Sequence, residues 1–201
     1  ISGGLTGLIL GDSALDINVH DTYFVVGHFH IVMGLSGTFG MISGIYHWFP
    51  KMFGRMMNKS LGFAHFWLTI ITAYGIFFPM HFLGLAGVPR RYYANTEFPM
   101  FNEMYDINEL ITVFAILAAA AQGIFIFNIF YSIFKGPKAP QNPWESTTLE
   151  WTTPVEHIHG NWPGEIPTVH RWAYDYSKPG FEEDFIPQTV PLREGEDGDG
   201  H

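Results

Sequence analysis

Three long stretches without a single aspartate, glutamate, lysine or arginine constrain the fold of this chain more than any other feature. They cover residues 22–50, 60–89 and 110–134. Each exceeds the about 20 apolar residues that a helix needs to cross the hydrocarbon of a bilayer, where a helix satisfies its own backbone hydrogen bonds. The sequence therefore predicts an all-α integral membrane protein with three transmembrane helices, at about 22–50, 60–89 and 102–134.

The segments on either side differ from these stretches in composition. Residues 1–19 open with the apolar run ISGGLTGLILG, which is too short for a span and lacks the basic flank of a secretory signal. We expect the end of a preceding helix there, followed by an outer loop. Residues 135–201 contain five basic and twelve acidic residues, and prolines that disfavour long helices. They are expected to form an acidic, extended and soluble tail.

The lysines and arginines predict how the helices are oriented. Lys51, Arg55 and Lys59 lie between the first two stretches, and two more lysines follow the third. Because lysine and arginine are enriched on the cytoplasmic side of a membrane, this loop and the tail are expected on the cytoplasmic or matrix side. Arg90 and Arg91 then lie on the outer side. They either anchor a helix end among the headgroups or clamp an anionic group, for which the guanidinium fork is suited.

Two histidines occur inside the first stretch, in the motif HDTYFVVGHFH. A helix turns by about 100° per residue, so His28 and His30 project from opposite faces and cannot chelate one ion together. The chain has no cysteine, which excludes thiolate metal sites. Haem iron is commonly held by histidine, and we expect the two histidines to serve one haem each. The alternative is that each histidine only hydrogen-bonds a neighbouring helix.

Other histidines allow more than one interpretation. His20 and Asp21, just before the first stretch, combine imidazole and carboxylate with access to water, which suits Mg²⁺ or Mn²⁺. The other interpretation is a plain helix start, with Asp21 favoured by the helix dipole. Three histidines on apolar segments are expected to make core or interface hydrogen bonds: His47, His65 and His81. The tail histidines are expected to be exposed, with weak metal binding by the first two as an alternative: His157, His159 and His170.

Four segments together resemble one known family: LDINVHDTYFVVGHFHIVM, HWFPKMFGR, FFPMHFLGLAGVPRRY and NPWESTTLEW. They are similar to subunit I of the haem-copper terminal oxidases of the cytochrome c oxidase type, and the resemblance covers nearly the whole chain. It implies that the three spans form the C-terminal part of a twelve-helix-type oxidase bundle. Two positions depart from the pattern, since Gly27 stands where alanine is expected and Ile31 where tyrosine is expected.

The resemblance also implies a role for each candidate residue. His28 would be the proximal ligand of the high-spin haem, at which oxygen is reduced, and His30 an axial ligand of the low-spin haem. His20 and Asp21 would bind Mg²⁺ or Mn²⁺ together with a carboxylate from subunit II. The haem propionates would be bound near three further residues: Arg90, Arg91 and Asp16.

For the complete protein, the resemblance implies a proton-pumping cytochrome c oxidase that reduces O₂ to water with electrons from cytochrome c. Its cofactors would be a low-spin and a high-spin haem of the heme A type, together with copper B and Mg²⁺ or Mn²⁺. The partners would be the N-terminal part of subunit I, subunit II with copper A, subunit III, cytochrome c, O₂ and membrane lipid, with no nucleic acid. The membrane would be the bacterial plasma membrane or the mitochondrial inner membrane.

Other functions remain open at this point. A quinol oxidase of the same family would ligate its haems from the same helix, and the copper site of subunit II would distinguish it. A membrane dihaem cytochrome that only carries electrons would have two low-spin haems, and a transporter with a histidine relay would have none. The copper-ligating histidines, their tyrosine, the second low-spin ligand and the proton channels would all precede Ile1, so we expect this chain alone not to reduce oxygen.

Overall fold

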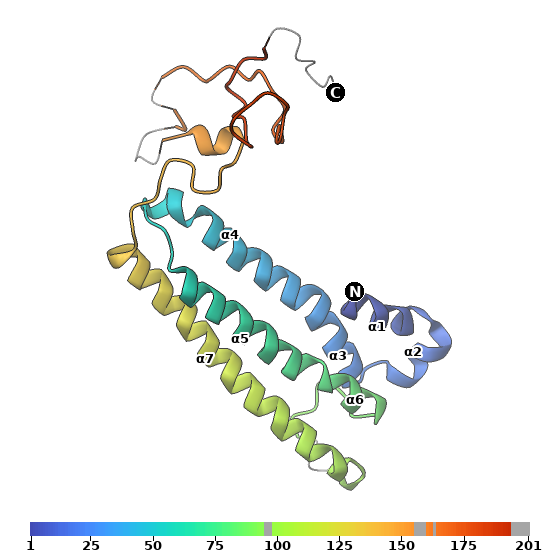
Figure 1. Cartoon of the computed structure of the whole chain (residues 1–201). Coiled ribbons are helices and arrows are strands. Elements are labelled where there is room, and N and C mark those ends of the chain that lie inside the picture. Colours follow the sequence, from blue (N-terminus) through green and yellow to red (C-terminus); the bar gives the residue numbers. More distant parts are fainter. Residues whose placement is uncertain (95–97, 155–159, 163, 194–201) are drawn as a thin grey trace. The chain divides into compact units, whose positions relative to one another are not determined.

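The computed structural model describes residues 1–94, 98–154, 160–162 and 164–193. Within these residues the chain forms helices and no strand, in the order shown in Figure 1: α1 (Ser2–Gly11), α2 (Ser13–Val19), α3 (Tyr23–Phe29), η1 (His30–Gly34), α4 (Leu35–Phe53), α5 (Lys59–Phe77), α6 (Pro79–Leu85), η2 (Pro99–Met104), α7 (Tyr105–Lys135) and η3 (Leu149–Thr152). The chain divides into a helical unit, Ile1–Tyr46 with Asn58–Phe134, and a tail unit, His47–Met57 with Lys135–His201.

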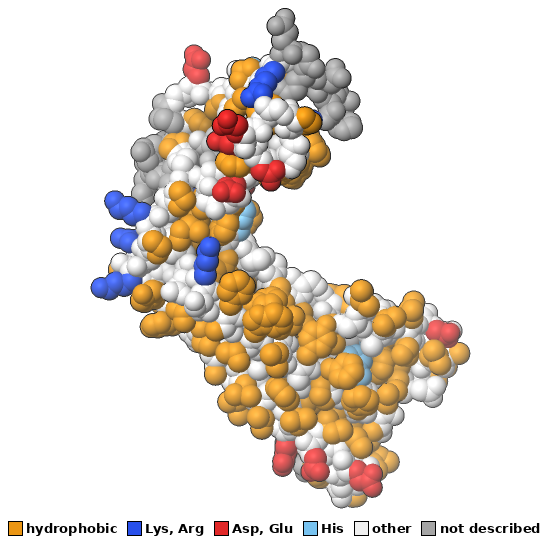
Figure 2. Space-filling model, viewed as in Figure 1, with side chains coloured by type: hydrophobic (Ala, Val, Ile, Leu, Met, Phe, Trp, Pro, Cys, Tyr) orange, Lys and Arg blue, Asp and Glu red, His pale blue; other side chains and the backbone are white. Residues whose placement is uncertain are grey.

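Three helical segments are long and apolar enough to cross a membrane: Tyr23–Phe53, Lys59–Leu85 and Pro99–Lys135. This confirms the predicted all-α membrane fold with three spans. Many large apolar side chains of the helical unit point outward, Phe63 and Ile116 among them, and hydrophobic side chains cover much of its visible face in Figure 2. Large apolar exteriors mark surfaces that face lipid or further protein.

The first span changes its geometry at the histidine motif. Thr22 caps α3, because its hydroxyl accepts a hydrogen bond of 3.2 Å from the amide of Phe24. The π-helical turn η1 then begins at His30 and ends at Gly34, after which α4 continues the span. A π-turn inserts one residue into a helix, and such turns are frequent at functional sites.

Pro79 breaks the second span into α5 and α6. Proline has no amide hydrogen and its ring collides with the preceding turn, so the helix cannot continue unchanged. The amide and the ring atom Nδ1 of His81 each lie 3.1 Å from the carbonyl oxygen of Phe78, which satisfies this acceptor beside the break. α6 ends at Leu85, so the helical part of this span is shorter than the predicted range 60–89.

Buried polar contacts tie α7 to α5. Asn128, which is fully buried, donates to the carbonyl of Asn58 at 3.1 Å and accepts from its amide at 3.2 Å. Ser132 donates to Asn128 at 3.0 Å, and farther along the helices the ring of His65 lies 3.3 Å from Gln122. Hydrogen bonds between helices matter in a membrane, because lipid competes with apolar packing.

The backbones of α3 and of the α5–α6 segment approach each other at two glycines. A Cβ atom on Gly84 would lie 2.1 Å from the amide nitrogen of Phe24, and one on Gly27 would lie 2.8 Å from the carbonyl oxygen of Phe77. Only a residue without a side chain permits so close an approach. Gly27, where the family pattern led us to expect alanine, is therefore a close-packing position one residue before His28.

The segment before the first span folds as α1 and α2. The carboxylate of Asp12 accepts a hydrogen bond of 2.9 Å from the amide of Ala14 and so caps α2. This cap favours helix in residues 13–19, which belong to the segment where we expected an outer loop. α2 ends at Val19, so His20 and Asp21 lie in the short connection between α2 and α3.

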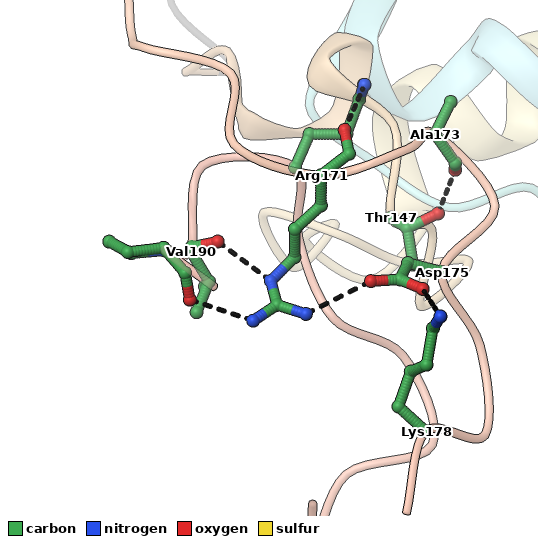
Figure 3. Close-up of polar contacts among 8 residues, drawn as sticks. Thr147, Arg171, Ala173, Asp175, Lys178 and Val190 are labelled. Carbon is green, nitrogen blue, oxygen red and sulfur yellow. Dashed lines mark hydrogen bonds and ion pairs between the residues drawn. The ribbon is translucent and has the colours of Figure 1, made fainter. Parts of the chain in front are cut away.

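The tail unit is organised around one buried arginine, Arg171, which is 5% exposed. Its Nε and Nη2 atoms donate to the carbonyls of Val190 and Pro191, each at 2.8 Å (Figure 3). Its Nη1 atom donates to Asp175 at 3.0 Å, and Lys178 pairs with the same carboxylate at 3.1 Å. A buried charge is tolerated when it is paired and its donors are satisfied. The described part of the tail contains no long helix, as its prolines predict.

Gly84→Ala tests the close contact of α6 with α3. The added methyl group would meet the backbone of Phe24, which cannot move aside like a flexible side chain, so we expect a loss of about 1–3 kcal/mol of stability from overpacking. Thermal unfolding of the purified membrane protein measures the loss. Gly123→Ala on α7 is the matched control, since a Cβ there meets nothing within 4 Å, and an equal effect of both changes would contradict the contact.

Candidate functional site

His28 faces α1. Its Nδ1 atom lies 2.8 Å from the hydroxyl oxygen of Thr6. That hydroxyl also lies 2.9 Å from the carbonyl of Gly3, and when it donates its hydrogen there its oxygen accepts from Nδ1 of His28, the tautomer in which Nδ1 carries the ring proton. Gly7 permits this approach, because a Cβ on Gly7 would lie 3.1 Å from Cε1 of His28.

His30 faces the end of α5. Its Nδ1 atom lies 2.9 Å from the carbonyl oxygen of Val26, and a carbonyl can only accept, so this Nδ1 also carries the ring proton. The ring of Phe77 stacks on the imidazole with centroids 4.7 Å apart and planes 9° from parallel. Gly34 keeps space at the ring edge, since a Cβ there would lie 3.4 Å from Cδ2 of His30.

Both imidazoles therefore have Nε2 as their free atom. Within the ranges that the structure describes, neither His28 nor His30 has a hydrogen-bond partner at Nε2. An unprotonated imidazole nitrogen binds transition metals, and metal-bound histidines usually donate their other ring N–H to an acceptor. The two rings contact different elements, α1 and α5, so they serve separate positions.

The loops before α3 and after α6 are paired. Thr22 and Pro89 form an antiparallel bridge, flanked by a bond of 3.0 Å from the amide of Tyr23 to the carbonyl of Val88. On the other flank, the amide of Arg90 donates to the carbonyl of Asp21 at 2.9 Å. Segments far apart in sequence are thereby fixed side by side at one end of the helical unit.

Arg90 and Asp21 also pair through their side chains. The Nε and Nη2 atoms of Arg90 lie 2.7 and 2.5 Å from the same carboxylate oxygen, Oδ1. Oδ2 of Asp21 is left facing His20, whose Nε2 lies 3.7 Å away, while Nδ1 of His20 lies 3.5 Å from Asp16. Arg91 makes no hydrogen bond or ion pair to any described residue.

The charges around Asp21 keep it ionised. The hydrogen bond from Arg90 lowers the pKa of the Asp21 carboxyl, and attraction to the Arg90 guanidinium, to His20 and to Arg91 acts in the same direction against the opposing effect of desolvation. The carboxylate consequently persists to lower pH than an ordinary aspartate would. An ionised Oδ2 beside an imidazole is a suitable pair of ligands for a divalent cation.

This pair is not a complete metal site. No group of three or more histidine, cysteine, aspartate or glutamate side chains lies close enough to hold a metal ion among the described residues. His20 and Asp21 can therefore supply two protein ligands at most. Mg²⁺ commonly retains several waters and takes few protein ligands, so two are compatible with such an ion if further ligands come from outside this chain.

The other histidines lie away from His28 and His30 in the sequence, and each is described by its own contacts. His65 and His81 are buried and hydrogen-bonded in the helical unit, as expected. His47 belongs to the tail unit, where its ring stacks on Trp144 at 5.7 Å and its carbonyl accepts from the same indole at 3.0 Å. His170 is exposed, as expected. The histidine pair for which weak metal binding was considered lies outside the described residues: His157 and His159.

Several residues around the histidines were not identified from the sequence. Thr6 bonds His28 and Phe77 stacks on His30, although both are distant in the chain from the histidine motif. Threonine and phenylalanine are unremarkable in apolar helices, so composition gives no signal of these contacts. Gly7 did give a signal of close packing beside His28, since small residues mark close helix approach in membranes.

The fold and this site define a multispan membrane protein whose first full span carries two histidines, each bonded through Nδ1 to a different acceptor and unpaired at Nε2 among the described residues. Residues 1–119 match the family described as Cytochrome C and Quinol oxidase polypeptide I. The chain belongs to this family, the haem-copper oxidases, and membership implies haem and copper cofactors for the complete subunit.

Curated relatives agree with the family. The chain is 50% identical over 193 residues to the alternative cytochrome c oxidase subunit 1 of Bradyrhizobium diazoefficiens, covering 95% of this chain and 33% of the relative. It is 47% identical to cytochrome c oxidase subunit 1 of a Synechocystis species, over 87% of this chain and 30% of the relative. The subunit 1 of Thermostichus vulcanus is 44% identical over 88% of this chain and 31% of its own length. The chain thus spans about a third of the length of these relatives.

Arg90→Gln tests the pairing of the two loops. The change removes both donors to Oδ1 of Asp21, so the loops should open more often and the amide of Tyr23 should exchange its hydrogen severalfold faster. Hydrogen–deuterium exchange with mass spectrometry measures this. Arg91→Gln is the matched control and should leave the rate unchanged. If the Tyr23 amide exchanged at the same rate in the wild type and in both variants, the backbone hydrogen bonds alone would hold the two loops together.

Proposed function

We propose that this chain is the C-terminal part of the catalytic subunit of a proton-pumping cytochrome c oxidase, which reduces O₂ to water with electrons from cytochrome c. One observation carries the proposal: His28 and His30 lie on one membrane helix, bond through Nδ1 to different acceptors, and keep Nε2 free. The names of the relatives support cytochrome c rather than quinol as the electron donor.

His28 fits the proximal ligand of the high-spin haem, and His30 fits an axial ligand of the low-spin haem. The fit rests on the tautomer, because the bonds to Thr6 and Val26 leave the unprotonated nitrogen that iron requires. When bound, the haems and copper B supply the one-electron and oxygen chemistry. The residues of this chain orient the two imidazoles and keep each ring proton on Nδ1.

Arg91 and Arg90 are suited to binding haem propionates. Arg91 has no hydrogen bond or ion pair within the described part of the chain, and Arg90 uses only Nε and Nη2 on Asp21. Guanidinium groups offset much of the cost of burying a carboxylate. Asp16 is itself anionic, so a propionate beside it requires a proton or a cation between the two, and His20 at 3.5 Å is the nearest candidate.

His20 and Asp21 are suited to binding Mg²⁺ or Mn²⁺. Oδ1 of Asp21 is occupied by Arg90, which leaves Oδ2 and Nε2 of His20 as the ligands from this chain. Waters and a carboxylate from subunit II would complete the coordination. The ion would neutralise part of the negative charge that Asp16 and the propionates bring to this end of the helical unit.

The assembly follows from the same proposal. The N-terminal part of subunit I, subunit II with copper A, and subunit III would cover the apolar exterior together with lipid. The loop with Lys51, Arg55 and Lys59 and the acidic tail would lie on the cytoplasmic or matrix side of a bacterial plasma membrane or mitochondrial inner membrane. The paired loops with Arg90 and Arg91 would then lie on the outer side.

Substitution of the two histidines tests the proposal directly. In the complete oxidase, His28→Leu should abolish oxygen reduction and carbon monoxide binding while the low-spin absorbance remains. His30→Leu should remove the low-spin absorbance instead. Optical difference spectra measure both outcomes, and a pyridine haemochrome assay should count one haem fewer in each variant. Spectra intact in both variants would contradict the assignment.

The same spectra separate the alternatives. A dihaem cytochrome that only carries electrons has two low-spin haems and should not bind carbon monoxide, whereas a transporter with a histidine relay should show no haem absorbance. Oxygen uptake with reduced cytochrome c or with quinol as the only donor separates the two kinds of oxidase. Activity with quinol alone would correct the donor and leave the haem ligands unaffected.

Asp21→Asn tests the cation site. The amide is neutral and a poorer ligand, so oxidase from cells grown with manganese should lose most of its Mn²⁺ paramagnetic resonance signal. Asp106→Asn, at the start of α7, is the matched control and should retain it. An unchanged signal in the Asp21 variant would return His20 and Asp21 to the simpler role of a helix start.

A further inference from the structure

We propose that Phe77 is a positioning residue that fixes the plane of the His30 imidazole, and that it thereby tunes the low-spin haem. The inference rests on the proposed role of His30 as an axial ligand. It concerns a contact between two spans, the stacking of the Phe77 ring on His30 with centroids 4.7 Å apart and planes 9° from parallel.

The hydrogen bond of His30 does not fix its ring by itself. Nδ1 donates to Val26 at 2.9 Å, and a single bond at one atom permits the ring to tilt about that atom. A parallel aromatic face opposes such a tilt, because any rotation drives a ring edge into the stacked partner. The ring of Phe29 also contacts His30, at 4.3 Å, but it is inclined by 31° and belongs to the preceding residue of the same span. Among the described residues, Phe77 is the aromatic residue that contacts His30 from another span.

Phe77 is held rigidly by the break between α5 and α6. It is the last residue of α5, and its carbonyl oxygen would lie 2.8 Å from a Cβ on Gly27. His81 packs beside it, with its ring edge-on to Phe24 at 4.9 Å and Nδ1 bonded to the carbonyl of Phe78. The break therefore contacts the first span through backbone at Gly27, in α3, and through a side chain at His30, at the start of η1.

His81 gives a second reason to regard the break as more than packing. It is 7% exposed, and its Nε2 is buried without a hydrogen-bond partner among the described residues. A buried acceptor without a donor costs about 1–3 kcal/mol of stability, so an apolar side chain at this position would be expected to give a more stable fold. Unsatisfied buried groups often accompany functional constraints, and here the ring holds the segment that carries Phe77.

Orientation of an axial imidazole affects the haem electronically. Axial ligands and the contacts that orient them are the means by which a protein adjusts haem properties. If Phe77 only filled space, any apolar side chain of similar volume would replace it. If its flat face fixes the ring plane, only another aromatic side chain would do so.

Paramagnetic resonance of the oxidised complete oxidase distinguishes these roles. Phe77→Leu should displace and broaden the low-field line of the low-spin haem by more than its linewidth, and shift its midpoint potential, with haem content unchanged. Phe77→Tyr retains the aromatic face and should keep the wild-type line. Phe82→Leu on α6 is the matched control, because this half-exposed ring packs on Phe78 and has no ring contact with a histidine among the described residues. It should change neither signal.

The outcomes separate this inference from the proposed function. A wild-type line and potential in Phe77→Leu, with a low-spin signal that His30→Leu abolishes, would overturn the positioning role and leave the ligand assignment standing. A low-spin signal that survives His30→Leu would overturn the ligand assignment. If Phe77→Leu does not assemble, Phe77→Met makes the same test, since its flexible side chain fills the volume without a flat face.

Discussion

The close approach of α3 to the broken second span is the constraint on which the rest of the helical unit depends. Gly84 against the amide of Phe24 and Gly27 against the carbonyl of Phe77 leave no room for a Cβ atom. Because backbone meets backbone at both points, neither helix can rotate or slide without a collision. The same contact determines the direction in which His28 and His30 point, and it brings the loop before α3 beside the loop after α6. The packing of α3 against the second span therefore also sets the positions of the candidate site residues.

The imidazoles of His28, in α3, and of His30, at the start of η1, both bond through Nδ1 but differ in their surroundings. His28 donates to the hydroxyl of Thr6, which itself donates onward to Gly3, whereas His30 donates to a carbonyl of its own helix, that of Val26. The acceptor behind a ligating histidine influences its basicity. The bond between His28 and Thr6 therefore depends on the position of α1 relative to α3. The bond between His30 and Val26 lies within one span and depends only on the helical backbone there. The two positions can respond separately to movements of the neighbouring helices.

The sequence predicts those features that depend on neighbours along the chain. The three spans follow from the charge-free stretches, and the opposite faces of His28 and His30 follow from helix geometry. The contacts of Thr6 and Phe77 do not, because they depend on how separate helices pack. Pro79 is visible in the sequence as a helix breaker, but proline also occurs within kinked membrane helices, so it does not reveal that the break contacts His30. The pairing of Arg90 with Asp21 was missed for the same reason.

The paired loops before α3 and after α6 show what the pairing of Arg90 with Asp21 maintains. Asp21 and Arg91 have φ of 55° and 67°, in the left-handed region that favours glycine, and such residues cost about 1–3 kcal/mol each. Both lie at the same end of the antiparallel bridge between Thr22 and Pro89, on the flank where the amide of Arg90 bonds to the carbonyl of Asp21. The turn at Asp21 directs its carboxylate to Arg90 and His20. Strain, bridge and ion pair thus act on the same few residues, and the cooperation of the backbone contacts with the side-chain pair accounts for a conformation that neither residue prefers alone.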